Sequence, residues 1–288
     1  MKVGFLGDVH GHVFHVLAVI AEWQRRAETQ LDLIVQVGDL GAISDVASGD
    51  HQTHRFARED PAELDFPRLL TATGPLAQSL HKARRCLASP IVFIRGNHDD
   101  AGWLTGLPTA AGSATVPVDP FDLFRYVPDG TVLVENGVYF GFLGGIETTH
   151  PHPATIDPAA YAGMIARAPG SLDVLVTHDP PLGAGEGYRS TRQGSALVSA
   201  LDTHLAPSLH IGGHVHAAIG PKQFSVTTYY GCAILVPAAQ HNPRHAVGSG
   251  SFAVWDTETG AFTFVSEPWL RQFDGHFDFV RYMAAFNA

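Results

Sequence analysis

Cysteine is scarce in this 288-residue chain, which contains only Cys86 and Cys232. Two cysteines are too few for the disulfide framework of a small secreted domain or for a zinc site built from thiolates, and we interpret both as buried thiols. Long apolar runs are also lacking, since no stretch approaches the roughly 20 residues that a membrane-spanning helix needs. Met1-Lys2 leads straight into an apolar segment, so we expect no signal sequence. These absences predict a cytoplasmic protein without membrane association.

Positive charge is in short supply as well. The chain has 18 Lys and Arg against 28 Asp and Glu, a formal net charge of -10, which makes nucleic acid an unexpected partner. A phosphorylated ligand is still compatible with this balance, because bound divalent cations would reverse the sign of the local field. Charged residues make up 16% and hydrophobic residues 45% of the chain, so it has enough apolar material for a core and is not a disordered protein. Seventeen histidines are the first indication of metal chemistry.

Short apolar runs alternate with longer amphipathic segments. The short runs are rich in Val, Ile and Leu, are bounded by turn residues and predict buried strands: residues 3–6, 33–37, 91–94, 174–176 and 209–211. The longer segments predict helices: residues 13–26, 76–87, 158–168 and 195–205. This alternation predicts an α/β fold with at least partly parallel sheets and helices outside.

The remaining strand-like segments look more antiparallel. Asn136-Gly137 separates two such segments, 132–135 and 138–143, and predicts a tight hairpin. Four later segments also predict strands: 223–228, 232–236, 252–255 and 261–265, with turns at Tyr230-Gly231 and Thr259-Gly260. We expect these segments to form a second sheet packed on the first, the irregular stretches 44–75 and 100–130 to be loops, and residues 1–288 to form a single domain on which the tail, 267–288, packs.

Five motifs made of metal-binding residue types follow the five predicted core strands: Asp8-Val9-His10-Gly11, Gly38-Asp39, Gly96-Asn97-His98-Asp99, Thr177-His178-Asp179 and Gly213-His214-Val215-His216. In open α/β sheets, ligands bind beyond the carboxyl ends of the strands. If the five strands are parallel neighbours, all five motifs meet at one edge. Any one of these motifs is weak evidence, whereas the ordered set of five predicts a metal centre.

The residue types indicate which metals would bind. Carboxylates, imidazoles and one amide form a mixed nitrogen and oxygen ligand set, which suits manganese, iron, zinc or nickel better than calcium. An aspartate can bridge two cations, and two ions about 3.5–4 Å apart can clamp the attacking and the leaving oxygen of a phosphoryl group.

The ordered set resembles the calcineurin-like metallophosphoesterase superfamily, whose pattern is Asp-x-His, Gly-Asp, Gly-Asn-His-Asp/Glu, His and Gly-His-x-His. The resemblance extends from Asp8 to His216 and implies a four-layer α-β-β-α sandwich of two mixed β-sheets flanked by helices. It also implies two metal ions bound by seven residues. Asp8, His10 and His216 would bind one ion, Asn97, His178 and His214 the other, and Asp39 both.

The resemblance also suggests the catalytic groups. His98 would protonate or stabilise the leaving oxygen, and Asp99 would either orient His98 or cap local backbone. The implied chemistry is in-line attack on phosphorus by a metal-bound hydroxide.

Departures from the pattern bear on the substrate. Protein phosphatases of this superfamily extend Gly-Asp to Gly-Asp-x-x-Asp-Arg-Gly, whereas this chain reads Gly38-Asp39-Leu40-Gly41-Ala42-Ile43-Ser44. Without that arginine, the pattern favours a phosphodiester, which carries one negative charge fewer. The segments around His178 and His214 are similar to those of a small-molecule phosphodiesterase branch that includes enzymes acting on cyclic nucleotides.

The sequence therefore predicts a phosphodiesterase acting on a small substrate. The alternatives are a phosphomonoesterase or nucleotide pyrophosphatase using the same site, and a catalytically inactive metal-binding scaffold. Arg189, Arg192 and His150 are candidate substrate contacts. The natural substrate, the identity of the metal pair and the oligomeric state stay open at this stage.

Overall fold

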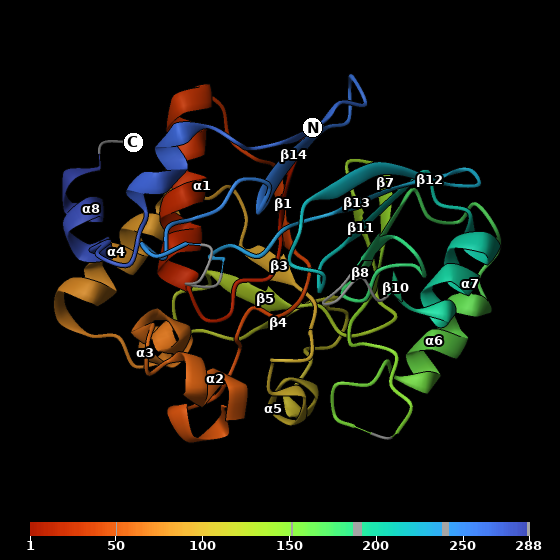
Figure 1. Cartoon of the computed structure of the whole chain (residues 1–288), viewed down its shortest axis with the longest axis horizontal. Helices are drawn as coiled ribbons and strands as arrows, with labels where there is room; N and C mark the ends of the chain where they lie inside the picture. Colours follow the sequence, from red (N-terminus) through yellow and green to blue (C-terminus); the bar gives the residue numbers. More distant parts are fainter. Residues whose placement is uncertain (50, 151, 187–191, 238–241, 287–288) are drawn as a thin grey trace.

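The computed structural model of the chain describes residues 1–49, 51–150, 152–186, 192–237 and 242–286. Two β-sheets face each other in the middle of the molecule, and helices cover the outer face of each (Figure 1). Helices α1, α4 and α8 lie on one side, and α6 and α7 lie on the other. The predicted α/β sandwich of four layers, α-β-β-α, is confirmed.

The first sheet has seven strands in the order β15-β14-β1-β2-β3-β5-β4. Strands β1, β2, β3 and β5 run parallel, and antiparallel strands complete both edges. The strand bounds are β1 Lys2–Leu6, β2 Leu33–Gln36, β3 Ile91–Phe93, β4 Val116–Pro117, β5 Phe124–Tyr126, β14 Phe252–Asp256 and β15 Phe262–Phe264.

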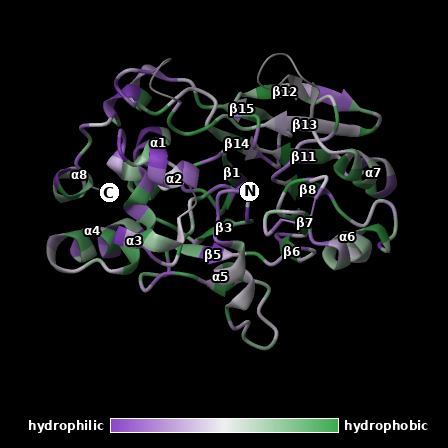
Figure 2. Ribbon diagram, turned by 60° about the horizontal axis from the view of Figure 1, so that its bottom comes forward, coloured by the Kyte–Doolittle hydropathy of each residue, from purple (hydrophilic) through white to green (hydrophobic). Residues whose placement is uncertain are grey.

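The second sheet has six strands in the order β12-β13-β11-β8-β7-β6. Its four central strands are parallel, and antiparallel β12 and β6 form the edges. Figure 2 shows β12 at an outer edge with hydrophilic residues in purple, as expected for a largely exposed edge strand. The bounds are β6 Val132–Glu135, β7 Val138–Leu143, β8 Val174–Thr177, β11 Leu209–Gly212, β12 Ile219–Phe224 and β13 Thr227–Gly231; a separate two-stranded ribbon pairs β9 Gly185–Glu186 with β10 Arg192–Gln193.

The helices vary widely in length. Their bounds are α1 Val13–Ala27, α2 His51–Phe56, α3 Asp65–Leu70, α4 Gly74–Arg85, α5 Ala101–Gly106, α6 Pro158–Ile165, α7 Ala196–Leu205 and α8 Phe279–Ala285, with 3₁₀ turns η1 Val46–Ser48, η2 Pro61–Leu64 and η4 Pro268–Gln272. Among the described residues, no helix combines the length and the apolar character that crossing a bilayer requires.

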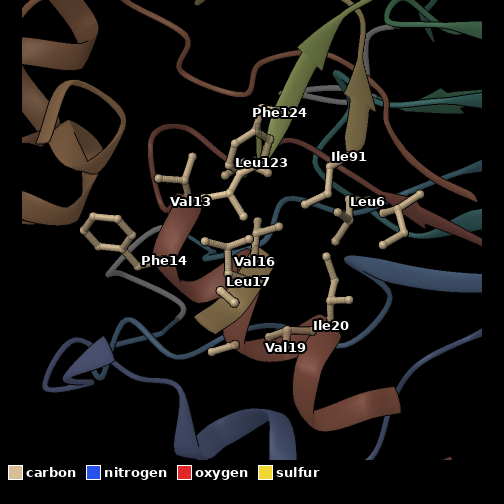
Figure 3. Packing of buried hydrophobic residues seen from close by; sticks show 14 of the residues in the cluster. Leu6, Val13, Phe14, Val16, Leu17, Val19, Ile20, Ile91, Leu123 and Phe124 are labelled. Atoms are coloured by element: carbon tan, nitrogen blue, oxygen red, sulfur yellow. The ribbon is translucent and has the colours of Figure 1, made fainter. Parts of the chain in front are cut away.

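Strand periodicity explains the layering. Alternate residues of a strand face opposite sides of the sheet, so Val3 and Phe5 of β1 point into the core between the sheets. Leu6, in contrast, faces helix α1. Figure 3 shows this outer contact, in which apolar residues of α1 pack on the first sheet: Val13, Val16, Leu17 and Ile20 lie beside Leu6, Ile91 and Phe124.

Two predicted strands are wrong. Residues 223–228 do not form one strand, because the chain turns at Ser225 (φ 55°) and Val226 between β12 and β13. Residues 232–236 are buried but belong to no strand. Their amide groups bond to separate partners instead: Cys232 to Gly212 at the end of β11, Ala233 to Gly250 and Leu235 to Asp8. Tyr230-Gly231, predicted as a turn, lies within β13.

The division of strands between the sheets also differs from the prediction. The later strands β14 and β15 join β1 in the first sheet, whereas the β6–β7 hairpin joins the second. The predicted loop 44–75 contains helices α2 and α3, and 100–130 contains α5, β4 and β5.

The tail contributes buried side chains to the outer core. Phe273 and Met283 are fully buried in the cluster around α1, and Lys82 of α4 donates hydrogen bonds to the carbonyl oxygens of Met283 and Phe286. These contacts support tail packing, and the single-domain assignment stays a prediction.

Candidate metal centre

The five motifs converge although their strands belong to two sheets. Strands β1, β2 and β3 of the first sheet lead into Asp8, Asp39 and Asn97, whereas β8 and β11 of the second lead into His178 and His214. The five strands are therefore not neighbours in one sheet, which was the condition under which the sequence predicted that the motifs meet. The motifs still meet, because the parallel strands of both sheets have their carboxyl ends at the same end of the sandwich.

One group of ligand atoms lies around the end of β1. Asp8, His10, Asp39 and His216 each offer a ligand atom, all within 4.8 Å of one another. His10 Nε2 lies 3.3 Å from His216 Nε2, and His216 Nε2 lies 3.0 Å from Asp8 Oδ2.

A second group shares Asp39 with the first. Asp39, His178 and His214 offer ligand atoms within 4.8 Å of one another. His178 Nε2 lies 3.4 Å from Asp39 Oδ2 and 3.1 Å from Asn97 Oδ1. All seven residues predicted as ligands are thus brought together, and Asp39 stands between the two groups.

Two buried oxygen atoms show that these residues fit cations. Asp8 Oδ2 and Asp39 Oδ2 are buried and form no hydrogen bond, since their contacts with histidine nitrogens lack hydrogen-bond geometry. A buried carboxylate oxygen without a partner is costly. A cation between these oxygens and the histidine nitrogens would remove that cost.

The backbone of the ligand loops is strained in a way that fits a binding site. His10, Asp39, His214 and His216 all have positive φ, between 46° and 65°, a conformation that non-glycine residues adopt rarely and at a cost. Strain of this kind clusters at functional sites. Four of the seven candidate ligands show it.

Two glycines let the loops approach each other. A Cβ atom on Gly96 would collide with the Asp39 carboxylate, and one on Gly213 would collide with Asp8. The sequence places a glycine in both positions because the backbone must pass directly against a ligand side chain.

The electrostatics keep some histidines neutral and draw protons to others. Burial lowers the pKa of His10 and of His214 to about 4, so both imidazoles offer a lone pair at neutral pH. Burial also opposes the charged form of His178, but the Asp39 and Asp8 carboxylates raise its pKa to about 10. The same carboxylates that raise this pKa would also attract a cation.

His98 lies at the same centre. Its backbone N–H donates to Asp39 Oδ1 at 2.7 Å, and its ring centroid lies 5.1 Å from that of His10. The side chain is partly exposed, so it stands where a substrate could reach it.

The Asp99 carboxylate caps backbone. Its two oxygens accept four N–H bonds, from Asp39 and Gly96 on Oδ2 and from Gly41 and Ala42 on Oδ1. These contacts favour the second of the two predicted roles, in which Asp99 positions the Asp39 loop, and not the predicted catalytic role. Burial and the nearby Asp39 carboxylate raise the Asp99 pKa to about 6.

Gln36 is a positioning residue that the sequence prediction missed. It is fully buried, donates to the carbonyl oxygens of Gly7 and Gly38 and accepts from Gly38 N–H, so it holds the ends of β1 and β2 together. The signal was one amide in an otherwise apolar strand, Leu-Ile-Val-Gln.

Of the three predicted substrate contacts, the structure describes the side chain of His150 alone. His150 is exposed and lines a cavity of about 790 Å³ between α5 and the segment 148–160, which none of the seven ligands lines. Arg189 lies outside the described residues, and Arg192 is described only by its backbone in β10. Their roles stay predictions.

Comparison with known proteins gives a match over most of the chain and local matches to curated proteins. The model of the family described as calcineurin-like phosphoesterase matches residues 1–218. Metallophosphoesterase domain-containing protein 1 of Homo sapiens is 33% identical over 69 residues, which cover 23% of this chain and 21% of that protein. The chain thus matches about a fifth of the length of this relative.

Solved structures share the fold at low identity. One crystal structure aligns with a TM-score of 0.54 and 16% identity, covering 92% of this chain and 98% of its own. The protein TT1561 of Thermus thermophilus aligns with a TM-score of 0.50 and 13% identity over the same shares. These similarities support the four-layer architecture.

Proposed function

The chain belongs to the calcineurin-like phosphoesterase family, and from this premise we propose that it is a phosphoric ester hydrolase with two metal ions that acts on small phosphodiesters. One observation carries the proposal. Asp39 offers ligand atoms to two groups at once, one with Asp8, His10 and His216 and one with His178 and His214.

The seven side chains would bind two cations. Asp8, His10 and His216 would hold one cation, Asn97, His178 and His214 the other, and the Asp39 carboxylate both. Bound there, the cations would lower the pKa of a coordinated water towards neutrality and offset charge on the phosphoryl group. The neutral imidazoles of His10 and His214 and the unpaired oxygens of Asp8 and Asp39 provide ligands that need no prior loss of a proton.

His98 is the proposed proton donor. Its backbone is fixed by the bond to Asp39 Oδ1, and its imidazole stands beside His10 on the accessible side of the centre. A ring N–H in this position would pass its proton to the ester oxygen that leaves, so that an alcohol departs and not an alkoxide.

The engagement of Arg95 by other protein groups supports a diester. Arg95, which directly precedes the Gly96-Asn97 motif, is only 3% exposed and is held by Asp129 at 2.7 Å and by the carbonyl oxygens of Pro153 and Thr155. This guanidinium is therefore not free to bind a doubly charged monoester. A diester needs less compensation because it carries one negative charge fewer.

A separate cavity offers room for an organic group, although none of the seven ligands lines it. The cavity, of about 790 Å³, has Arg95 and Ala101 in its wall, and these residues flank in sequence the segment that contains Asn97 and His98. Threonine and histidine side chains also line it, including Thr105, Thr148 and His150. We assign it to one of the two ester groups of the substrate.

The test compares two substrates on one metal-loaded sample. With manganese, the protein should hydrolyse bis-p-nitrophenyl phosphate faster than p-nitrophenyl phosphate, and His178→Ala should abolish both activities. The opposite order of rates would refute the diester assignment. No turnover with any of manganese, iron, zinc or nickel would refute the proposal of catalysis.

A further inference from the structure

Three polar side chains are buried in the apolar layer between the second sheet and α7. Thr177 of β8 and His210 of β11 point outward from the sheet, away from the core between the sheets, and Asp202 of α7 faces them. All three are at most 5% exposed. The apolar residues of this layer form a separate cluster, which includes Leu143, Leu175, Val198, Leu201 and Leu205. The ring of Tyr229 packs edge-on against His210, with the centroids 5.1 Å apart.

The three side chains form one hydrogen-bonded chain that ends beside a predicted metal ligand. Asp202 Oδ2 lies 3.0 Å from His210 Nδ1, and His210 Nε2 lies 2.8 Å from Thr177 Oγ1. The Thr177 hydroxyl donates to the carbonyl oxygen of Asp179 at 2.6 Å. This last bond closes a turn around His178.

Counting the available hydrogens shows which atoms of these three side chains carry protons. The Thr177 hydroxyl has one hydrogen, and it is used on the Asp179 carbonyl oxygen. Its contact with His210 is therefore satisfied only if His210 Nε2 carries a proton and donates. His210 Nδ1 faces a carboxylate oxygen, so one further proton must lie between His210 and Asp202, and the pair has no net charge.

Burying three hydrogen-bonded polar side chains in an apolar layer costs more free energy than filling the layer with apolar residues. Asp202 Oδ1 is buried and forms no hydrogen bond, so the His210 contact is the main compensation for this carboxylate. Apolar residues of similar volume would fill the space at equal or better stability. Residues behind metal ligands, in contrast, orient them and commonly change metal affinity 10–100-fold when removed.

We propose that Asp202 and His210 are positioning residues for the metal centre, acting through Thr177 on the loop that carries His178. The proposal rests on the metal-binding role of His178 in the proposed function. The Nε2 proton of His210 keeps the Thr177 hydroxyl directed at the Asp179 carbonyl oxygen. The turn then presents the His178 imidazole to Asp39 and Asn97, with Gly213 N–H bonded to the His178 carbonyl oxygen from the other side.

The first experiment measures metal binding and needs no substrate. Mn²⁺ is titrated calorimetrically into chelator-treated protein, into Thr177→Val, which loses the hydroxyl at nearly constant volume, and into Thr177→Ser, which keeps it. Thr177→Val should weaken one of two Mn²⁺ sites about 10–100-fold, and Thr177→Ser should bind as the unmodified protein does. Unchanged Mn²⁺ binding by a folded Thr177→Val protein would overturn the proposal.

The second experiment uses the unmodified chain, so it stands even if a variant fails to fold. Long-range ¹H–¹⁵N spectra of the assigned His210 imidazole show which ring nitrogens carry protons. A protonated Nε2 supports the proposal, and an unprotonated Nε2 overturns it. The two proposals can fail separately. If the protein binds two Mn²⁺ ions and Thr177→Val weakens one site, but no phosphate ester is hydrolysed, the proposed function is refuted and the positioning role is not.

Discussion

Asp39 Oδ2 lies 3.4 Å from His178 Nε2 across the junction of two different sheets. Asp39 follows β2 of the first sheet, and His178 follows β8 of the second. The position of Asp39 is fixed by Asp99, whose carboxylate accepts the Asp39 N–H at 3.0 Å, and that of His178 by a bond of 2.9 Å between its Nδ1 and the Val37 carbonyl oxygen. The centre therefore depends on how the two sheets pack.

Replacing Asp39 tests whether one carboxylate serves both groups. Asp39→Ala should reduce the bound manganese by at least one ion per chain and lower turnover by about 10³-fold or more, since about 4 kcal/mol of charge stabilisation would be lost. Elemental analysis and initial rates measure the two effects. Asp157→Ala is the matched control, because Asp157 caps α6 and its loss should cost about 1 kcal/mol of stability with metal content unchanged. Full metal content in Asp39→Ala would contradict the shared-ligand arrangement.

Replacing His98 tests its role as a proton donor. His98→Gln should lower the rate about 10²–10⁴-fold for a diester with an alkyl leaving group, and much less for bis-p-nitrophenyl phosphate, whose leaving group departs without protonation. Metal content should stay the same. His204→Gln, on α7 with its ring bonded to the Arg167 carbonyl oxygen, is the control. Equal losses on both substrates would show that His98 does not act on the leaving oxygen.

Asp65 predicts a pH dependence of stability. Burial raises the pKa of Asp65 to about 6 despite its ion pair with Arg68, above the value of about 3.9 in an unfolded chain. A raised pKa means that the folded state holds this proton more tightly, so the contribution to stability is full below pH 4 and is lost as the pH rises through 6.

The variant Asp65→Asn keeps the neutral form at every pH. Relative to that of the unmodified protein, its free energy of unfolding should rise by about 1–3 kcal/mol between pH 4 and pH 7.5, because only the unmodified protein loses stability as Asp65 ionises. Urea unfolding at both pH values measures this difference. A difference that is constant with pH would show that Asp65 does not titrate in this way.

The tail should matter for stability and not for metal binding. Phe273 is fully buried against α1 and α8 residues, so Phe273→Ala should cost about 3–5 kcal/mol in unfolding free energy. Trp269→Ala, at a partly buried neighbour, should cost less. Manganese affinity of the folded variants should equal that of the unmodified protein, and a weakened metal site would show that the tail also supports the centre.

The ligand motifs were predictable because each is local: a ligand residue follows a short apolar strand, and in four of the five motifs a glycine stands between them. The assignment of strands to sheets was not predictable in this way, because a buried parallel strand such as β8 has the same pattern as β1. Residues 232–236 were mistaken for a strand because they are apolar and mostly buried, although their amide groups bond to three separate segments of the chain and not to one neighbouring strand. The turn at Ser225 and Val226 was missed because it contains no glycine, asparagine or proline: Ser225 is a weaker turn signal, and Val226 favours a strand.

Supporting residues were harder to predict than ligands. Asp99, predicted as catalytic, caps four backbone N–H groups, and this distinction depends on where the loop of Asp39 lies in space. His210 and Asp202 are eight positions apart on different elements, and nothing in their sequence neighbourhood marks them as partners. Their pairing follows from the packing of α7 on β11.

The central claim is that two metal ions share the Asp39 carboxylate. Anomalous X-ray diffraction from manganese-loaded crystals tests it most directly. We predict two peaks on either side of Asp39, one against Asp8, His10 and His216 and the other against Asn97, His178 and His214. A single peak, or two peaks of which only one contacts Asp39, would contradict the account.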